Sequence, residues 1–220
     1  MLRQLIRKLL GKNTAFKSAD YWENHYRGGG NSGSGSYNHL AEFKAEVING
    51  LIAQYGINSM VEFGCGDGNQ LRMFNCSNYT GVDVSPTIIA KCTEAFAGDS
   101  SKRFVLYDPA SFAAADFKRD AAMSLDVLYH LVEQKVYDEY LDNLFSAGEK
   151  LVIIYAADID IPQQTSHELY RKFTKDVAHR FPNWQLTDTV RNKYKPTNYM
   201  DESGSNADFF VYKPLSSQAC

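Results

Sequence analysis

V-E-F-G-C-G-D-G-N-Q-L, residues 61–71, reads as a buried strand that ends in a tight glycine turn. A second apolar stretch, Y-T-G-V-D-V-S-P at residues 79–86, places Asp83 19 positions after Gly64. In α/β sheets, a glycine turn after one strand and an acid at the tip of the next hold a nucleoside. The stretch therefore predicts an α/β sheet that binds an adenosine-type cofactor.

The spacing of the glycines separates two classes of cofactor. A dinucleotide fingerprint needs G-x-G-x-x-G, which seats a pyrophosphate on a helix N-terminus, but Asn69 stands where its third glycine belongs. Glu62 and Asp67 flank the turn, and their carboxylates repel a pyrophosphate and attract a cation. S-adenosylmethionine carries a sulfonium and an ammonium and no phosphate. The sequence therefore favours S-adenosylmethionine over NAD and disfavours an oxidoreductase.

These motifs resemble those of the class I S-adenosylmethionine-dependent methyltransferases. The matching segments are E-F-G-C-G-D-G (62–68), G-V-D-V-S (81–85) and S-L-D-V-L-Y-H-L (124–131), and the order of elements extends the resemblance over residues 37–213. The resemblance implies that Asp83 binds both ribose hydroxyls and that Asp108 faces the adenine amino group. The expected cofactor-binding residues are Glu62, Gly64, Gly66, Asp67, Gly68, Asp83 and Asp108.

Hydrophobic periodicity and turn residues give the remaining elements. Helices separate the first five strands, and no long helix separates the last two. This order of elements predicts a Rossmann-like α/β fold. We expect a seven-stranded, mostly parallel sheet with helices on both faces and an antiparallel final strand. The expected strands are 59–63, 79–84, 103–107, 121–125, 150–155, 184–190 and 208–212, and the expected helices are 37–55, one that begins near 67, 86–97, 133–145 and 166–180.

We expect the chain to divide into an N-terminal segment, residues 1–36, and a domain over residues 37–220 that the resemblance implies is a methyltransferase domain. The pattern of residues 1–12 predicts an amphipathic, basic helix, for which packing on the domain or on a dimer mate is favoured over contact with a membrane surface. Residues 28–36 are glycine and serine apart from Asn31. Because residues 1–27 are too few to form a domain, a lid over a ligand is favoured over a plain linker. Homodimerisation stays open.

Composition excludes several classes of function. A net charge of -3 argues against a general nucleic-acid binder. The four cysteines show no paired spacing, so neither a metal site nor a disulfide framework is expected, and a reducing cytoplasm is the simple interpretation. No stretch is long and apolar enough to span a bilayer.

The catalytic candidates follow the fourth expected strand. His130 has the pKa range of a general base for a hydroxyl acceptor; the alternative is a histidine satisfied by hydrogen bonds at a helix start. Asp126 would either orient that histidine or cap the turn. The Asn/Asp-Pro-Pro-aromatic motif of relatives that methylate amide or base nitrogens is absent, which disfavours that chemistry.

The acceptor should be recognised by residues outside the core. Arg171 and Lys172 would hold an anionic group, or else form a solvated helix face. The leading acceptor is a hydroxyl of a sugar, a nucleotide-linked sugar or a similar small polar metabolite. The alternatives are a nucleic-acid or protein methyltransferase, which would need a basic surface, and a non-catalytic binding protein. The expected substrate-binding residues are Tyr21, His25, Tyr26, Arg27, His167 and Arg171.

Overall fold

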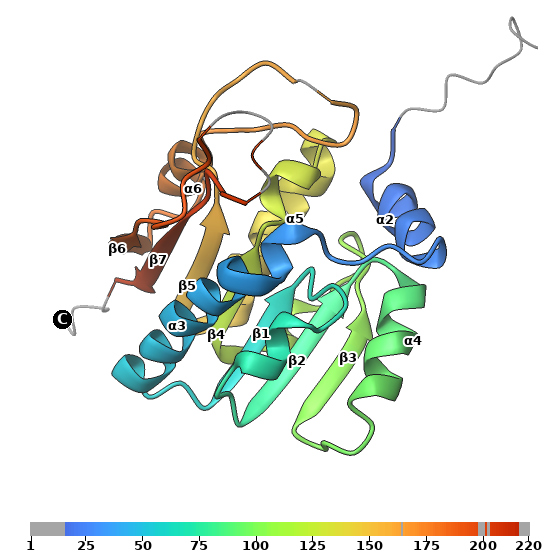
Figure 1. Ribbon diagram of the computed structural model, residues 1–220. Coiled ribbons are helices and arrows are strands. Elements are labelled where there is room, and N and C mark those ends of the chain that lie inside the picture. Colours follow the sequence, from blue (N-terminus) through green and yellow to red (C-terminus); the bar gives the residue numbers. More distant parts are fainter. Residues whose placement is uncertain (1–15, 164, 198–200, 202, 216–220) are drawn as a thin grey trace, which may run out of the picture.

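The computed structural model describes residues 16–163, 165–197, 201 and 203–215. Within them the strands form one sheet in the order β3-β2-β1-β4-β5-β7-β6 (Figure 1). The strands are β1 (Ser59–Phe63), β2 (Asn78–Asp83), β3 (Lys102–Leu106), β4 (Arg119–Leu125), β5 (Gly148–Ala156), β6 (Trp184–Val190) and β7 (Asp208–Pro214). The α-helices are α2 (Ser18–Arg27), α3 (Asn38–Tyr55), α4 (Pro86–Ala95), α5 (Gln134–Ala147) and α6 (Phe173–Arg180).

The strand directions match the expected fold. Strands β1 to β5 pair in parallel, whereas β7 runs antiparallel to both of its neighbours, β5 and β6. The predicted seven-stranded, mostly parallel Rossmann-like sheet with an antiparallel final strand is confirmed. The amphipathic helix expected at residues 1–12 lies outside the described residues.

Helices cover both faces of the sheet, and β1 shows the effect on its side chains. Met60 packs in a core with residues of α3, whereas Val61 and Phe63 pack in a second core with residues of α5 and α6. Successive side chains of a strand point to opposite faces, so a strand covered on both sides is mostly apolar, and its buried Glu62 needs a polar partner, the Tyr79 hydroxyl. The sheet is therefore a buried layer, and only its edges and the ends of its strands remain for a site.

Local sequence signals set several helix ends where they were expected. Ser85 caps α4, because its Oγ accepts a hydrogen bond from the Ile88 amide at 3.2 Å, and Pro86 opens the first turn. Gly56 ends α3 in the left-handed conformation, with φ of 57°.

The helix expected to begin near Asp67 is absent, and this prediction was wrong. A single 3-10 turn, Gln70–Met73, stands in its place. Asn49 of α3 holds the end of that turn: its Nδ2 donates to Met73 O at 2.8 Å, and its Oδ1 accepts from the Asn75 amide at 2.8 Å. A tertiary contact therefore stops the helix and returns the chain to β2.

The helix expected at 166–180 is shorter, since α6 begins at Phe173. The backbone before it has other partners: the Leu169 amide donates to Tyr129 O at 2.7 Å, and the Lys172 amide donates to Asp160 Oδ1 at 2.8 Å. Asp158 Oδ1 then accepts a hydrogen bond from the Thr174 amide at 3.0 Å, close to the start of α6. Residues 165–172 consequently form a loop over the end of the sheet.

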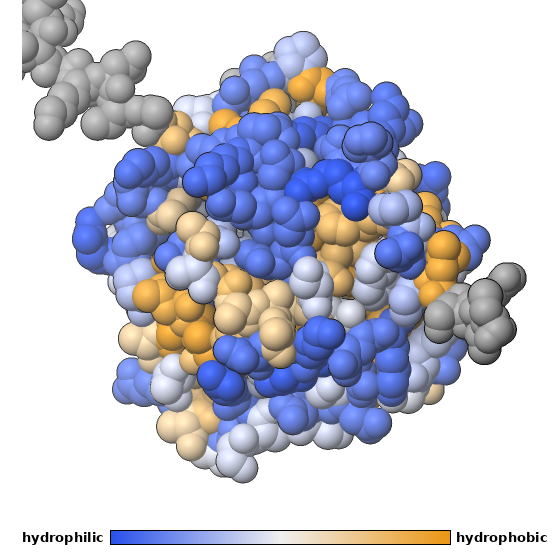
Figure 2. All heavy atoms as spheres, turned by 180° about the vertical axis from the view of Figure 1, so that it is seen from behind, coloured by the Kyte–Doolittle hydropathy of each residue, from blue (hydrophilic) through white to orange (hydrophobic). Residues whose placement is uncertain are grey.

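The surface carries apolar residues in separate patches. On the face seen in Figure 2, these patches are divided by hydrophilic side chains. Leu106 and Leu186, both exposed, belong to β3 and β6, the two edge strands. No described helix is long and apolar enough to cross a membrane.

Candidate cofactor and acceptor site

A cavity of about 870 Å³ opens at the carboxyl ends of the parallel strands. Its walls come from the turn after β1, the tip of β2 and the segments that follow β4 and β5. Helix α2 and residues 31–36 contribute the remaining side. Open α/β sheets bind ligands at this edge, because the strand order reverses there and leaves a crevice.

The turn after β1 needs its glycines for two reasons. Gly64 and Gly66 have φ of 75° and 55°, in the left-handed region that side chains disfavour. A Cβ on Gly64 would lie 2.5 Å from Val127 Cγ2, and one on Gly66 would lie 2.2 Å from Ser32 Oγ. Neighbouring segments therefore pack directly against bare backbone at this turn.

Asp83 lies at the tip of β2, 6% exposed and facing the glycine turn. Its Oδ2 accepts a hydrogen bond from the Gly66 amide at 3.1 Å, and its Oδ1 accepts one from the Ser85 amide at 3.0 Å. Burial raises the pKa of Asp83 to about 6, although these backbone hydrogen bonds oppose the shift. Each oxygen keeps a further lone pair with which it can accept a ligand hydroxyl.

Glu62 is the second buried carboxyl of the turn. It accepts a hydrogen bond from the Tyr79 hydroxyl. Burial raises the pKa of Glu62 to about 7, and the Tyr79 hydrogen bond and the charge of Lys44 partly oppose that shift. A cationic ligand group in the cavity would stabilise the ionised form.

Asp67 holds the glycine-serine loop, residues 28–36, against the turn. The Ser32 amide donates to Asp67 Oδ2 at 2.9 Å, and the Asp67 amide donates to Ser32 Oγ at 2.8 Å. The Tyr37 hydroxyl donates to the same carboxylate at 2.8 Å. The carboxylate expected beside the cofactor thus also closes the loop over it.

Helix α2 lies across the mouth of the cavity and is held by hydrogen bonds at both ends. At one end, Ser18 donates from its amide and its hydroxyl to the Glu133 carboxylate at 2.9 and 2.8 Å. At the other, Glu23 accepts from Ser85 Oγ at 2.6 Å and from Thr87 Oγ1 at 2.7 Å, and these hydrogen bonds lower its pKa. The helix therefore joins the start of α5 to the start of α4 (Figure 1).

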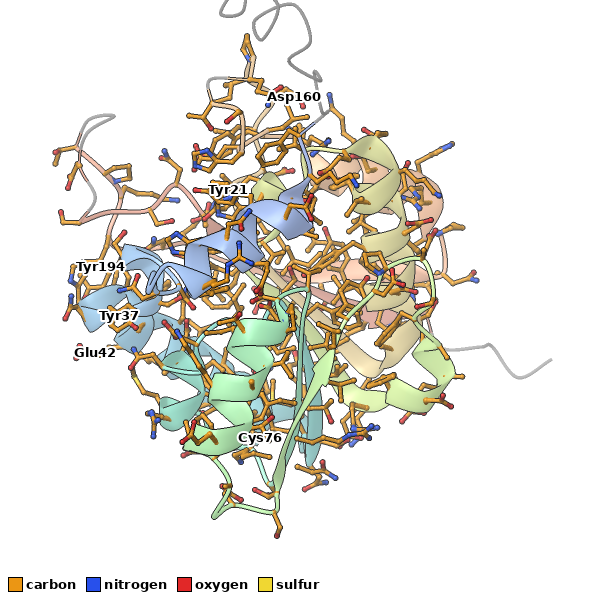
Figure 3. The ribbon with its side chains drawn as sticks, turned by 90° about the vertical axis from the view of Figure 1, so that its right-hand side faces the viewer. Tyr21, Tyr37, Glu42, Cys76, Asp160 and Tyr194 are labelled. Carbon is orange, nitrogen blue, oxygen red and sulfur yellow. The ribbon has the colours of Figure 1, made fainter. Side chains whose placement is uncertain are left out.

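Aromatic rings from three segments form a nearly parallel series at the roof. Tyr21, labelled on α2 in Figure 3, stacks on His167 with centroids 4.7 Å apart and on His25 at 6.3 Å. His167 in turn is parallel to His130 at 6.2 Å, and Trp22 meets His130 edge-on at 4.8 Å. The structure thus brings together three of the expected substrate residues and the expected base.

His130 has the protonation that a general base requires. Its Nδ1 lies 3.3 Å from His167 O, and a carbonyl oxygen only accepts, so Nδ1 carries the proton and Nε2 keeps the lone pair. Burial lowers the pKa of His130 below its ordinary value. The ring is therefore neutral near pH 7 and able to take a proton at Nε2.

Both carboxylate oxygens of Asp126 have partners other than His130. Its Oδ2 pairs with Lys44 Nζ at 2.7 Å, and its Oδ1 accepts from the Tyr129 hydroxyl at 3.2 Å. Its φ of 60° is rare for a residue other than glycine and is a mark of functional segments. The carboxylate lines the cavity as the partner of a buried lysine.

Lys44 is the functional candidate that sequence reasoning missed. Its side chain is 1% exposed, on α3, with its charge against Asp126. A signal was present, because Leu40, Lys44, Ile48 and Leu51 share one helical face and the other three are apolar. A lysine in the middle of an apolar stripe must find a buried counter-charge.

Four expected site residues do not line the cavity. Gly68 faces Phe96 and Cys92 instead, with a Cβ there 2.9 Å from Phe96 Cε2. Asp108 is exposed, and its carboxylate accepts from the Ala110 amide and the Ser111 hydroxyl of its own turn. Arg27 is exposed and donates to Asn24. Arg171 donates to the carbonyls of residues 131 and 132 at 2.9 and 3.1 Å, so it neither faces an acceptor nor lies on a solvated helix. Tyr26 does line the cavity; it is buried, and burial raises its pKa.

Comparison with known proteins gives the site a context. Residues 61–147 match a family model described as a methyltransferase domain. The N-methyltransferase NodS of Bradyrhizobium japonicum WM9, crystallised with S-adenosyl-L-homocysteine, is 14% identical and aligns with a TM-score of 0.70 over 90% of this chain and 99% of that chain. No curated protein matches this sequence.

Two further solved structures share the fold. Magnesium protoporphyrin IX methyltransferase (ChlM) of Synechocystis PCC 6803, with bound S-adenosyl-L-homocysteine, is 15% identical with a TM-score of 0.62 over 90% of this chain and 100% of that chain. The methyltransferase domain of the bacterial protein CtHen1-CN is 18% identical with a TM-score of 0.60 over 80% of this chain and 100% of that chain. At these identities the likeness concerns the fold alone.

Proposed function

We propose that this chain, a class I S-adenosylmethionine-dependent methyltransferase by its matched domain and its fold, transfers the methyl group to a hydroxyl of a small polar acceptor such as a sugar or a similar metabolite. The proposal depends on one observation: Asp83 and a neutral His130 line the same cavity. We further propose that α2 and residues 28–36 act as a lid on the domain that begins at residue 37.

The chemistry of the cavity fits S-adenosylmethionine. Glu62 and Asp83 are buried carboxyls that suit the ammonium and the ribose hydroxyls, and no arginine is among the described residues that line the cavity and could hold a pyrophosphate. When bound, the cofactor supplies a methyl carbon activated by the sulfonium. Glu62, Asp67, Gly64 and Gly66 are its proposed contacts from the turn after β1.

The residues of this chain would supply position and a proton acceptor. Trp22 and Tyr21 close the roof and exclude water, which favours in-line approach of the acceptor oxygen. His130 Nε2 takes the hydroxyl proton as the oxygen attacks. Asp126, held by Lys44, keeps a negative charge close to that place without taking the proton itself.

Calorimetry with S-adenosylhomocysteine and NAD tests the cofactor. We expect heat with the first and none with the second, and Asp83→Asn should weaken binding by about 1.5–3 kcal/mol, the value of a hydrogen bond to a charged group. Asp108→Asn is the matched control, since Asp108 also follows a strand but lies outside the cavity. Tight NAD binding, or equal losses in the two variants, would contradict the assignment.

The acceptor is tested by mass spectrometry of methylated products across a panel of sugars, nucleotide-linked sugars, peptides and short nucleic acids. We expect turnover with a small metabolite, because the lining of the cavity is acidic rather than basic. Turnover with nucleic acid or peptide alone would favour the alternative methyltransferases. Cofactor binding with no turnover on any acceptor would favour a non-catalytic binding protein. The three described cysteines are free thiols, in accord with a proposed cytoplasmic location.

A further inference from the structure

Negative side chains outnumber positive ones in the lining of the cavity. Among the described residues that line the whole cavity, two are lysines and seven are carboxylates. These lysines are Lys17, which is exposed, and Lys135, which is 83% exposed and pairs with Glu139 at 3.6 Å. Buried Lys44 is already paired with Asp126, and Arg171 donates to backbone carbonyls. A phosphate or carboxylate on the acceptor would therefore meet repulsion and find no arginine to bind it.

Two of these carboxylates lie around the expected base. Glu168 lines the cavity, and its charge, like that of Asp126, raises the pKa of His130 against the effect of burial. Glu168 accepts a hydrogen bond from Thr165 Oγ1 at 3.4 Å, a long contact that leaves the carboxylate oxygens lone pairs for a ligand. A donor-rich, positively charged group would satisfy them.

Aromatic faces complete this part of the cavity. Tyr21, Trp22 and Tyr129 all line it, from α2 and from the segment after β4. Aromatic rings attract cations to their faces, and the attraction grows when water is excluded. Tyr21 already stacks on His167 and His25, and the aromatic lining together with the carboxylates of the cavity favours an ammonium group over an anion.

We propose that the acceptor carries an ammonium group, bound among Tyr21, Trp22, Tyr129 and the carboxylate of Glu168, and that it carries no phosphate or carboxylate. The inference rests on the proposed function, since it describes the acceptor half of the same cavity. It narrows the acceptor to an amine-bearing small molecule, with the amine as the group recognised, and it disfavours nucleotide-linked acceptors.

A pair of isosteric probes tests the charge alone. Choline and 3,3-dimethylbutan-1-ol have the same shape. They differ at one atom, which is a positively charged quaternary nitrogen in choline and a neutral carbon in the alcohol. Binding of each to the protein, with and without S-adenosylhomocysteine, is titrated by ligand-observed NMR. We expect choline to bind about 3- to 30-fold more tightly, the range for cation–aromatic contacts, and phosphocholine to bind more weakly than choline.

Glu168→Gln should remove much of this preference. Glu139→Gln, at a half-buried carboxylate that pairs with Lys135 and does not line the cavity, should leave it unchanged. Equal affinity for choline and its neutral isostere, no detectable binding of either at 50-fold excess over the protein, or tighter binding of phosphocholine would overturn the inference. The heat of S-adenosylhomocysteine binding is measured on the same samples. Its absence would count against the proposed function, while the choline comparison still decides the charge preference.

Discussion

The ion pair between Lys44 and Asp126 should stabilise the fold far more than a surface pair does. Lys44→Met removes the charge and keeps most of the side-chain volume. Removing one partner of a buried pair costs about 3–5 kcal/mol when both groups are fully buried. The Lys44 side chain is 1% exposed, but that of Asp126 is 16% exposed and borders the cavity. Partial hydration of Asp126 reduces the expected loss to about 2–3 kcal/mol.

The assay is urea unfolding at pH 7, together with thermal unfolding. For a chain of this length the loss corresponds to a fall in Tm of about 4–12 °C. Lys193→Met is the matched control, because Lys193 Nζ lies 3.1 Å from Glu46 on α3, with side chains 53% and 71% exposed. Solvent screens an exposed pair, so the loss of stability in Lys193→Met should be much smaller than in Lys44→Met.

A double-mutant cycle isolates the pairing itself. Asparagine tolerates the φ of 60° that Asp126 adopts, so Asp126→Asn removes charge without adding backbone strain. We expect the Lys44→Met/Asp126→Asn double variant to be more stable than additivity predicts by at least about 1 kcal/mol. A Lys44→Met loss no larger than that of Lys193→Met, or additive changes in the cycle, would refute this reasoning.

Three further predictions concern the site. Burial raises the pKa of Asp83 to about 6, and the ligand hydroxyls need the ionised carboxylate. The affinity for S-adenosylhomocysteine should therefore be greatest above pH 6 and fall as the pH drops through 6. An unchanged pH profile in Asp83→Asn would contradict this. His130→Gln should lower the single-turnover rate about a hundredfold to ten-thousandfold and leave the cofactor affinity intact. It should also abolish the fall in rate at acid pH, whose midpoint lies below the ordinary pKa of histidine because burial lowers the pKa of His130. A wild-type rate would make the histidine structural. Gly66→Ala, whose Cβ would lie 2.2 Å from Ser32 Oγ, should expose residues 28–36 to protease and weaken cofactor binding. Gly50→Ala, on α3 with no atom within 4 Å of the added Cβ, should not; equal cleavage of both would contradict a docked loop.

Elements governed by neighbours in the sequence were predictable. The bounds of β1 agree with the expected strand to the residue, and the Ser85 cap and the Gly56 stop lie where their residue types require. Each of these depends on the backbone preference of one residue or on an alternation of apolar side chains, and both are present in the sequence itself. The missing helix after Asp67 shows the boundary of that reasoning, because Asn49, from another helix, ends the turn.

The sequence by itself determined the α/β fold, the glycine turn and the acid at the tip of β2, and through them the class of cofactor. Only the tertiary structure decided what the charged side chains do. Ser18 meets Glu133 across 115 positions and Lys44 meets Asp126 across 82, whereas Arg171, expected at the acceptor, donates to the backbone. The roof of rings likewise joins α2 to loops more than a hundred residues away. A charged or aromatic side chain takes whichever partner the fold brings near, and that partner has no fixed spacing along the chain.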